Sequence, residues 1–306
     1  MKYDIAIIGA GPAGLSAAIY AVRKGYKVLL ISKDVGGQVN VSGEIENYLG
    51  FSTIEGVELV SKFKEHVDKF KDIDLIEGKE IVKITQDNKD FILFDKDKTK
   101  YQANSVIIAT GREPRWLGIP GEDKFKGKGV SACATCDSPF FKNKEVIIIG
   151  GGNSGLEAAN MLSKFASKIT FIINTDKFVG DQILVDIIKQ DKKINVIYDN
   201  IVTEIKGGQV VESVLLKNLK NNKEEIVKTD GVFVAIGSQP TPKIEDLTDK
   251  DSGGAIKVNG DLETNIPGLY AAGDSNDLWG EQIIIAAGEG AKAAMRSAQY
   301  LSLLKK

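Results

Sequence analysis

Cys133 and Cys136 are the only two cysteines in the 306-residue chain, and two residues separate them. Thiols at this spacing can cycle between a dithiol and a disulfide and so carry two electrons. Asp137 follows the second cysteine directly. Its carboxyl group could protonate a departing thiolate if burial raises its pKa, or it could cap a helix, and the residues favour neither role. The cluster predicts a redox-active disulfide with Cys133, Cys136 and Asp137 as candidate catalytic residues.

A structural metal is the alternative use of a C-x-x-C pair. His66 is the only histidine, so a mononuclear zinc site would need two carboxylates or a second subunit to complete four ligands. His66 falls on a predicted amphipathic helix, residues 56–71, among lysines and acids. We therefore expect no metal site and assign His66 to the surface.

Two glycine-rich turns flank the cysteine pair, at residues 9–14 and 150–155, and both have the pattern G-x-G-x-x-G. The first glycine permits a tight turn, the second lets the backbone approach a pyrophosphate, and the third lets helix and strand pack closely. Each turn follows a predicted strand and opens a predicted helix, which makes the pattern informative. We therefore expect two dinucleotide-binding units. Their strand, helix and strand are predicted at residues 4–8, 14–24 and 28–31, and at residues 146–149, 155–166 and 169–173.

The cofactor preference of the second unit depends on the end of its second strand. About 20 residues after the glycine loop, an acid favours NAD and an arginine favours the 2′-phosphate of NADP. Residues 173–177 of this chain are Ile-Asn-Thr-Asp-Lys, so Lys177 could act only as a point charge and Asp176 lies beyond the expected position. A bidentate phosphate clamp is therefore missing. The arginines of the chain lie elsewhere, at Arg23, Arg112, Arg115 and Arg296.

The length of 306 residues predicts two domains, and the composition is that of an ordinary globular protein. The net charge of −2 shows no basic footprint for nucleic acid, and no apolar run is long enough to cross a membrane. The first predicted strand starts at residue 4, which leaves no room for a signal peptide, so we expect a cytoplasmic location. There, a lone C-x-x-C is typically redox-active or metal-binding.

Two similar segments predict where the chain crosses between domains. Residues 106–111 and 232–237 are apolar strands that end in glycine, and a stretch containing proline follows each. We expect an α/β fold of two Rossmann-like dinucleotide-binding domains, each three-layer ββα, with one inserted into the other. Antiparallel additions are predicted at residues 80–84, 91–94, 202–206 and 210–216. The expected domains are a discontinuous FAD-binding domain, 1–112 and 243–306, and a pyridine-nucleotide-type domain, 113–242, that carries the cysteine pair.

The chain carries several independent motifs in the order typical of the low-molecular-weight thioredoxin reductases, and it resembles that family over nearly its whole length. In parts it is most similar to the flavoprotein subunit of alkyl hydroperoxide reductase, whose extra N-terminal domain has no counterpart here. The matching motifs are residues 9–14, 36–38, 46–48, 109–111, 133–137, 150–154 and 271–274.

The resemblance implies bound FAD and a second nucleotide site. A strand-end aspartate, Asp274, is placed to accept a hydrogen bond from a ribityl or ribose hydroxyl. The expected FAD contacts are Gly9, Gly11, Pro12, Ala13, Gly14, Gly36, Gly37, Gln38, Asn47, Val82, Ala109, Thr110, Gly111, Gly273, Asp274, Gln282 and Ile283. The expected pyridine-nucleotide contacts are Gly150, Gly152, Asn153, Ser154 and Gly155.

The resemblance also implies a reaction. Reduced FAD would reduce the Cys133–Cys136 disulfide, and the dithiol would reduce a thioredoxin or thioredoxin-like protein. Cys136 would lie nearer the flavin, Cys133 would attack the partner, and Asp137 would serve as the acid. A homodimer, and a domain rotation about hinges at residues 111–114 and 237–240, are further implications of the family.

The electron donor is where the chain departs from its family. The NADPH-dependent members carry His-Arg-Arg-x-x-x-Arg where this chain has Ile173, Asn174, Thr175 and Val179. The peroxide-reductase relative has a glutamate aligned with Ile173. NADPH use is therefore doubtful. The donors that the sequence leaves open are NADH or NAD(P)H, reduced ferredoxin and a deazaflavin.

Other functions remain open from the sequence. The partner could be a peroxiredoxin-like or glutaredoxin-like protein instead of thioredoxin. A flavin-binding redox sensor without turnover is the non-enzymatic alternative. A ferredoxin-NADP reductase of the same architecture would lack the cysteine pair, so Cys133 and Cys136 count against it.

Overall fold

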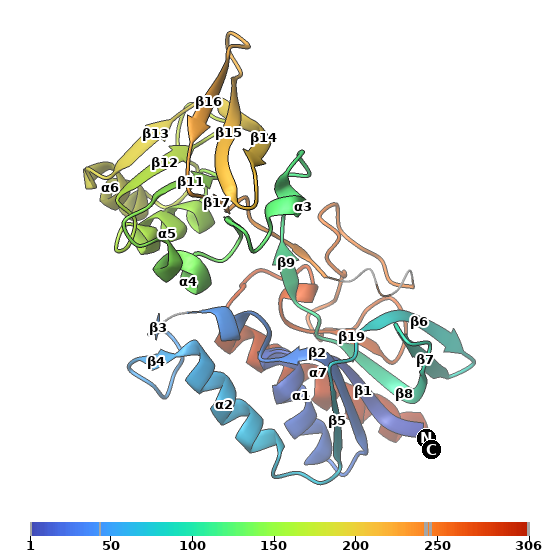
Figure 1. Cartoon of the computed structure of the whole chain (residues 1–306). Coiled ribbons are helices and arrows are strands. Elements are labelled where there is room, and N and C mark those ends of the chain that lie inside the picture. The colour runs from blue at the N-terminus through green and yellow to red at the C-terminus, as the bar shows by residue number, and fades with distance from the viewer. Residues whose placement is uncertain (1, 43, 242–243, 245–246, 305–306) are drawn as a thin grey trace. The chain divides into compact units, whose positions relative to one another are not determined.

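A computed structural model of the chain describes residues 2–42, 44–241, 244 and 247–304. Contacts divide it into two compact units, one comprising Met1–Glu113 with Gln239–Lys306 and the other comprising Pro114–Ser238 (Figure 1). The first predicted crossing, after residue 112, lies one residue before the end of the first segment. The second predicted crossing, between residues 242 and 243, falls outside the described residues.

The first unit is built on a sheet of seven strands in the order β5-β2-β1-β8-β7-β6, with β19 paired to β8. The strands β5, β2, β1, β8 and β19 run parallel, and β7 and β6 are antiparallel additions. Its helices and strands are β1 Lys2–Ala10, α1 Pro12–Val22, β2 Val28–Val35, the 3-10 helix η1 Gly37–Val41, β3 Glu44–Ile45, β4 Ile54–Glu55, α2 Gly56–Val67, β5 Ile73–Glu77, β6 Ile81–Asp87, β7 Asp90–Asp95, β8 Lys100–Ile108, β19 Leu269–Ala271, the 3-10 helix η3 Gly273–Ser275 and α7 Ile283–Leu304.

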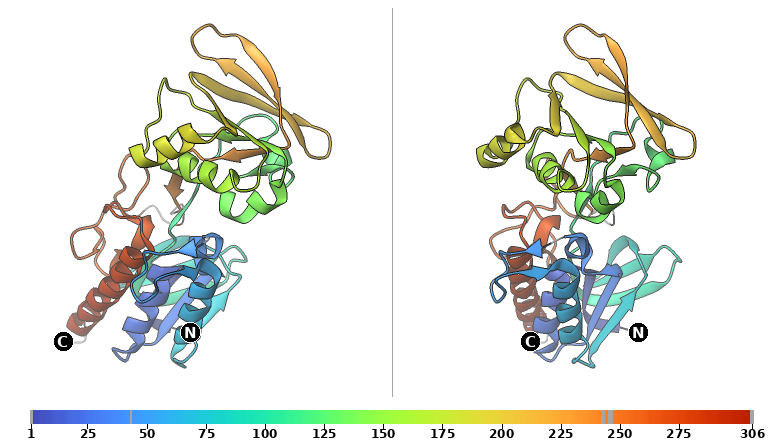
Figure 2. Two further views of the ribbon diagram at one scale, coloured as in Figure 1. Left: turned by 90° about the vertical axis from the view of Figure 1, so that its left-hand side faces the viewer. Right: turned by 60° about the vertical axis from the view of Figure 1, so that its left-hand side comes forward.

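Alternation along β1 gives this unit two cores. Ile5 and Ile7 pack under the helices, whereas Ala6 and Ile8 pack on the opposite face with residues of β6 and β7. Successive side chains of a strand point to opposite faces, so one strand serves both layers. In Figure 2 the C-terminal helix α7 lies beside α1 on the same side of the sheet, and the two helices are in contact.

The second unit repeats this plan with a parallel sheet in the order β10-β17-β11-β12-β13 and a separate antiparallel sheet β14-β15-β16. One core lies between the parallel sheet and helices α5 and α6, and the other lies against β14 and β15. Its elements are α3 Glu122–Phe125, β10 Val130–Ser131, α4 Ala134–Asp137, the 3-10 helix η2 Ser138–Phe141, β11 Glu145–Ile149, α5 Asn153–Leu162, β12 Lys168–Ile172, α6 Gln182–Gln190, β13 Ile194–Ile197, β14 Asn200–Gly207, β15 Val211–Asn218, β16 Glu224–Lys228 and β17 Gly231–Val234.

Two short strands join the units, β9 Arg112–Pro114 and β18 Ser238–Pro240, and they pair as a two-stranded sheet. Within the first unit, Gln239 Nε2 donates to Glu113 Oε1 over 3.1 Å, and the backbone N–H of Thr241 donates to Gly111 O over 2.9 Å. These bonds hold the returning segment against the departing one at the segments predicted as hinges. Rotation about them stays a prediction.

Both predicted helices after the glycine loops begin earlier than expected. α1 begins at Pro12 and not at residue 14, and α5 begins at Asn153 and not at residue 155. Proline at the first helical position supplies the right φ and loses only an N–H that has no partner there. In α1 the N–H of Leu15 already donates to Gly11 O, over 2.9 Å. The third glycine of each loop therefore lies inside the first helical turn.

Candidate functional site

The glycine loop between β1 and α1 has the geometry of a dinucleotide cradle. Gly9 has φ +102°, and a Cβ there would lie 2.2 Å from Ala109 O. A Cβ on Gly14 would lie 1.8 Å from Gly9 O, whereas a Cβ on Gly11 would meet nothing within 4 Å. The first and third glycines are thus required by packing, and the second faces open space. That space lies at the N-terminus of α1, where backbone N–H groups favour a pyrophosphate.

A buried hydroxyl group beside this loop also fits a bound dinucleotide. Thr110 Oγ1 is buried and has no hydrogen-bond partner in the described part of the chain. Buried polar groups are normally satisfied, so an orphaned hydroxyl at a nucleotide loop suits a ligand atom. Ser32, which sequence reasoning missed, supports the same loop by accepting a hydrogen bond from the Ala10 N–H over 3.0 Å.

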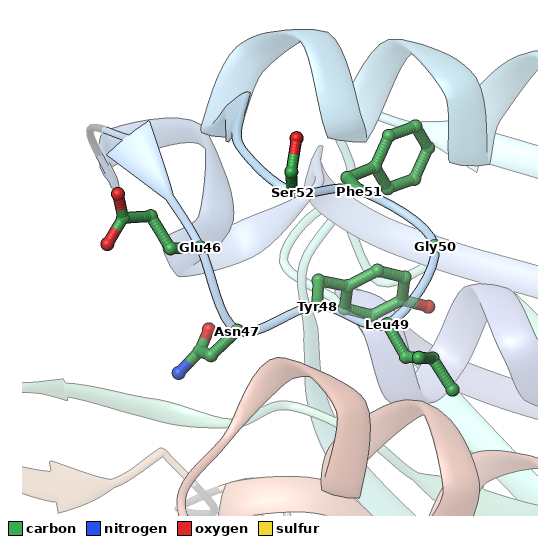
Figure 3. Close-up of a pocket in the computed structure, with 7 residues that line it drawn as sticks. All are labelled: Glu46, Asn47, Tyr48, Leu49, Gly50, Phe51 and Ser52. Atoms are coloured by element: carbon green, nitrogen blue, oxygen red, sulfur yellow. The ribbon is translucent and has the colours of Figure 1, made fainter.

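Three further predicted FAD contacts come together in this unit from distant segments. Asn47 Nδ2 donates to Gln282 Oε1 over 3.0 Å, and Gln38 Nε2 donates to Arg112 O over 2.9 Å. Arg112 also forms an ion pair with Glu281 at 3.2 Å. Asn47 belongs to the loop of residues 46–52, which lines a cavity of about 480 Å³ (Figure 3).

The predicted contact Asp274 lies on η3, which a glutamate of α7 holds in place. Glu289 Oε2 accepts hydrogen bonds from the Gly273 N–H over 2.7 Å and from Asn276 Nδ2 over 2.6 Å. Sequence reasoning missed Glu289, because a glutamate within a helix carries no local signal for this role. Burial, followed by the Glu281 carboxylate, raises the pKa of Asp274 to about 6 against the opposing effect of Arg112.

Val82 is the predicted FAD contact that the structure connects least to this group. It lies on β6, at the end of the strand order, and β8 and β7 separate it from β1. Its side chain is exposed. Contact between Val82 and a dinucleotide stays a prediction.

The cysteine pair lies in the second unit and forms the predicted disulfide, with an S–S distance of 2.05 Å. Cys133 is the N-cap residue of α4, and its Sγ accepts a hydrogen bond from the Cys136 N–H over 3.1 Å. Asp137 precedes η2 but makes no capping hydrogen bond to it through its side chain. Both cysteines and Asp137 are half-buried. None of the three residues is fully buried, which is compatible with disulfide exchange at this site.

The second glycine loop repeats the geometry of the first. Gly150 has φ +124°, and a Cβ there would lie 2.2 Å from Ala235 O. A Cβ on Gly155 would lie 1.8 Å from Gly150 O, and a Cβ on Gly152 would meet nothing within 4 Å. The open space at Gly152 has no packing explanation, so this loop too has the shape of a nucleotide cradle.

The surroundings of the second loop differ from those of a cofactor site specific for NADPH. Ile173 is 1% exposed and packs beneath Gly151, where an added Cβ would lie 2.7 Å from Ile173 Cγ2. The predicted contact Asn153 is engaged with Asp181, since it accepts from the Asp181 N–H over 2.7 Å and donates to Asp181 Oδ2 over 3.2 Å. Burial, and then the Asp181 carboxylate, raises the pKa of Glu157 above its usual range. The position of the expected ribose or phosphate ligand is thus apolar, and an acidic residue, Asp181, contacts the glycine loop through Asn153.

Neither a metal site nor a spanning helix is found in the described residues. No group of three or more His, Cys, Asp or Glu side chains there could hold a metal ion. No helix in that part of the chain has the length and apolar character that crossing a membrane requires.

Comparison with known proteins shows what this arrangement is similar to. A family profile described as pyridine nucleotide-disulphide oxidoreductase matches residues 3–290. The thioredoxin reductase of Listeria innocua is 39% identical over 313 residues, which cover 99% of this chain and 95% of that protein.

Solved structures agree with this likeness. The thioredoxin reductase of Lactococcus lactis, in a form called the FR conformation, has a TM-score of 0.90 and 36% identity, and the match covers 98% of this chain and 99% of that chain. A ferredoxin-flavin thioredoxin reductase from Clostridium acetobutylicum has a TM-score of 0.54 and 35% identity, with 100% of this chain and 99% of that chain covered.

The raised pKa of Asp274 predicts a pH-dependent stability of the FAD-free protein. The pKa is about 6 in the folded chain against an ordinary value of 3.8, so the folded state binds the proton more tightly than the unfolded state. The stabilisation is present below about pH 4 and is lost as the pH rises through 6. In the wild type, this loss should lower the thermal unfolding midpoint as the pH rises from 4 to 7. We expect the decrease to be smaller in Asp274→Asn, which cannot ionise at this position. Asp277→Asn, which changes an exposed carboxylate nearby, should keep the wild-type slope. Equal slopes for wild type and Asp274→Asn would contradict the assignment.

Proposed function

The chain belongs to the pyridine nucleotide-disulphide oxidoreductase family as an FAD-dependent flavoenzyme of the thioredoxin reductase type, and we propose from this premise that its electron donor is not NADPH. The family resemblance, the fold class of two Rossmann-like domains and FAD as cofactor are thereby confirmed. The observation that carries the proposal is Ile173, which is buried beneath Gly151 where a cofactor-binding side chain is expected. A buried isoleucine offers neither a charge for a 2′-phosphate nor an acceptor for a ribose hydroxyl.

We propose that the dithiol reduces a thioredoxin-like partner in two exchanges. The Cys133 thiolate attacks the partner disulfide, so that a bond forms between Cys133 Sγ and one partner sulfur while the other leaves as a thiolate. Asp137 supplies the proton that this thiolate takes up. Cys136 then loses its proton and attacks Cys133 Sγ as a thiolate, so that the Cys133–Cys136 disulfide forms while the bond from Cys133 to the partner sulfur breaks. The second partner sulfur leaves as a thiolate and takes up the proton that Cys136 lost, which releases the partner as a dithiol. FAD, when bound, supplies the two electrons that reopen the disulfide.

The assignment of Cys133 as the attacking sulfur comes from the family resemblance and is supported by one contact. The Cys136 N–H points at Cys133 Sγ over 3.1 Å, and a hydrogen bond to a sulfur favours its thiolate form. A peroxiredoxin-like or glutaredoxin-like partner would use the same exchanges, so the partner class is to be decided by assay.

Two donors remain for the flavin. The open face at Gly152 supports NADH, whereas the apolar strand end at Ile173 and the acidic neighbours Glu157 and Asp181 favour a donor that does not use this cradle. The name of the relative from Clostridium acetobutylicum identifies ferredoxin as the donor of that protein. We propose a reduced low-potential carrier such as ferredoxin as the first candidate and NADH as the second.

An anaerobic titration of the oxidised, FAD-loaded protein tests the donor. We expect NADPH to leave the visible flavin band essentially unchanged within seconds, because residues 150–180 contain no arginine that could clamp its 2′-phosphate. Reduced ferredoxin should bleach the band, and dithionite serves as the control that the flavin is reducible. Rapid bleaching by NADPH would refute the proposal, and bleaching by NADH alone would select the second candidate.

Serine variants of the two cysteines test their roles separately. We expect Cys133→Ser and Cys136→Ser each to lose disulfide reduction while keeping FAD, because the exchange needs both sulfurs. After chemical reduction, Cys136→Ser should form a stable mixed disulfide with oxidised thioredoxin, and Cys133→Ser should not, as mass spectrometry can report. Thr135→Ser keeps both thiols and should remain active. A mixed disulfide formed by Cys133→Ser instead would reverse the two roles.

We also propose a homodimer, which the family resemblance implies. Leu49 and Trp279, both in the first unit, are 89% and 97% exposed and offer apolar surface for a second copy. Light scattering should give about twice the chain mass of 33.1 kDa, and a single-chain mass at micromolar concentration would contradict it. A reducing compartment such as the cytoplasm is where this dithiol relay can operate, and it is the location that we propose.

A further inference from the structure

Ser131 makes two hydrogen bonds to the backbone of Cys133. It is the last residue of β10 and is 7% exposed. Its Oγ accepts a hydrogen bond from the Cys133 N–H over 2.9 Å and donates one to Cys133 O over 3.3 Å. A single buried hydroxyl group therefore binds both polar backbone groups of the first cysteine. The strand that carries Ser131 is itself anchored, because Ser131 is in register with Phe233 of β17.

These bonds hold Cys133 in the conformation that directs its sulfur. Cys133 has φ −120° and ψ 94°, outside the helical region, as an N-cap residue should. Its carbonyl oxygen also accepts from the Asp137 N–H over 3.2 Å. Because φ and ψ orient the Cα–Cβ bond relative to the following turn, these bonds direct Cβ so that Sγ can reach the Cys136 N–H, which lies at 3.1 Å.

The hydrogen bonds from Ser131 to the Cys133 backbone become more important when the disulfide is reduced. In the oxidised protein the S–S bond itself keeps the two sulfurs together. Two electrons and two protons convert it into two thiols, and that covalent closure is lost. The hydrogen bonds that join Ser131 and Asp137 to the Cys133 backbone do not depend on the S–S bond, so they remain as restraints on this residue. A sulfur that keeps its N–H donor has a lowered pKa and more thiolate character.

We propose that Ser131 is a positioning residue, which keeps the Cys133 sulfur against the Cys136 N–H in the dithiol state and so maintains Cys133 as the reactive thiolate. This role rests on the proposed function, in which Cys133 attacks the partner. In this role Ser131 acts through the Cys133 backbone, to which its hydroxyl group is hydrogen-bonded.

The same segment provides a matched control. Ser138 is fully buried, and its hydroxyl group donates to Ala134 O over 2.5 Å, so it binds the α4 backbone but not that of Cys133. α4 packs against η2 and α5. The charged groups on these elements are Asp137 and Glu157, and both are unchanged in every variant. A difference between Ser131→Ala and Ser138→Ala therefore isolates the bond to Cys133.

The test measures the thiol reactivity of Cys133 in the FAD-loaded, full-length protein. Each variant is reduced with a phosphine, freed of reductant, and alkylated with iodoacetamide between pH 5 and 9, while mass spectrometry follows the Cys133 peptide. We expect Ser131→Ala to raise the apparent pKa of Cys133, because Sγ would no longer be held against the Cys136 N–H. Alkylation near pH 6 should then slow about three- to tenfold, the range that losing this one hydrogen bond to the sulfur allows. Ser131→Thr, which keeps the hydroxyl group, should restore the wild-type profile.

FAD content and the thermal unfolding midpoint show whether each variant is folded, and Ser131→Gly provides a second deletion of the hydroxyl group without added volume. A wild-type pH profile in a folded Ser131→Ala or Ser131→Gly protein would overturn the proposal. An equal shift in Ser138→Ala would overturn it too, because any loosening of the loop would then suffice. The assay needs neither an electron donor nor a protein partner, so its failure is distinct from failure of the proposed function, which the titration and the mixed-disulfide trap report.

Discussion

The close approach of a helix to the strand before it is the constraint on which both halves of the molecule depend. In each unit the third glycine of the loop lies so near the first glycine's carbonyl oxygen that a Cβ would stand 1.8 Å away. In the first unit the same closeness continues at α7, where a Cβ on Gly290 would lie 1.9 Å from Ala13 O. Backbone packed this tightly fixes the helix N-terminus over the sheet edge, which is where a dinucleotide phosphate binds.

The two units share this scaffold but differ in what surrounds it. Around the first loop lie two polar groups suited to a ligand: the Thr110 hydroxyl, which has no hydrogen-bond partner among the described residues, and the Asp274 carboxyl group, whose pKa is raised by burial. Around the second loop, Ile173 packs into the core, and Asp181 occupies the Asn153 amide. The first loop therefore has nearby polar groups that suit a bound cofactor. The second loop keeps the same shape but has the apolar Ile173 where a side chain that selects NAD or NADP is expected.

Hydrogen bonds of the polypeptide backbone surround the redox centre. Cys133 Sγ meets a backbone N–H, and the Cys133 backbone is bound by the hydroxyl group of Ser131. Such contacts persist when the disulfide opens only if the supporting strand stays in place, and β10 is paired to β17 within the parallel sheet. The proposed control of thiol reactivity is thereby linked to the stability of that sheet.

The sequence by itself determined the features that local patterns encode. Both glycine loops, the strands around them and the Cys133–Cys136 pairing are short-range, because each depends on spacing within a few residues. Ser131 and Glu289 carried no such signal, since a serine or glutamate gains its role only from the group it meets in space. Only the tertiary structure decided that Ile173 lies beneath Gly151, and that Asn47 meets Gln282 from the far end of the chain. Burial and long-range contact depend on which segments pack together, and no window of sequence contains that information.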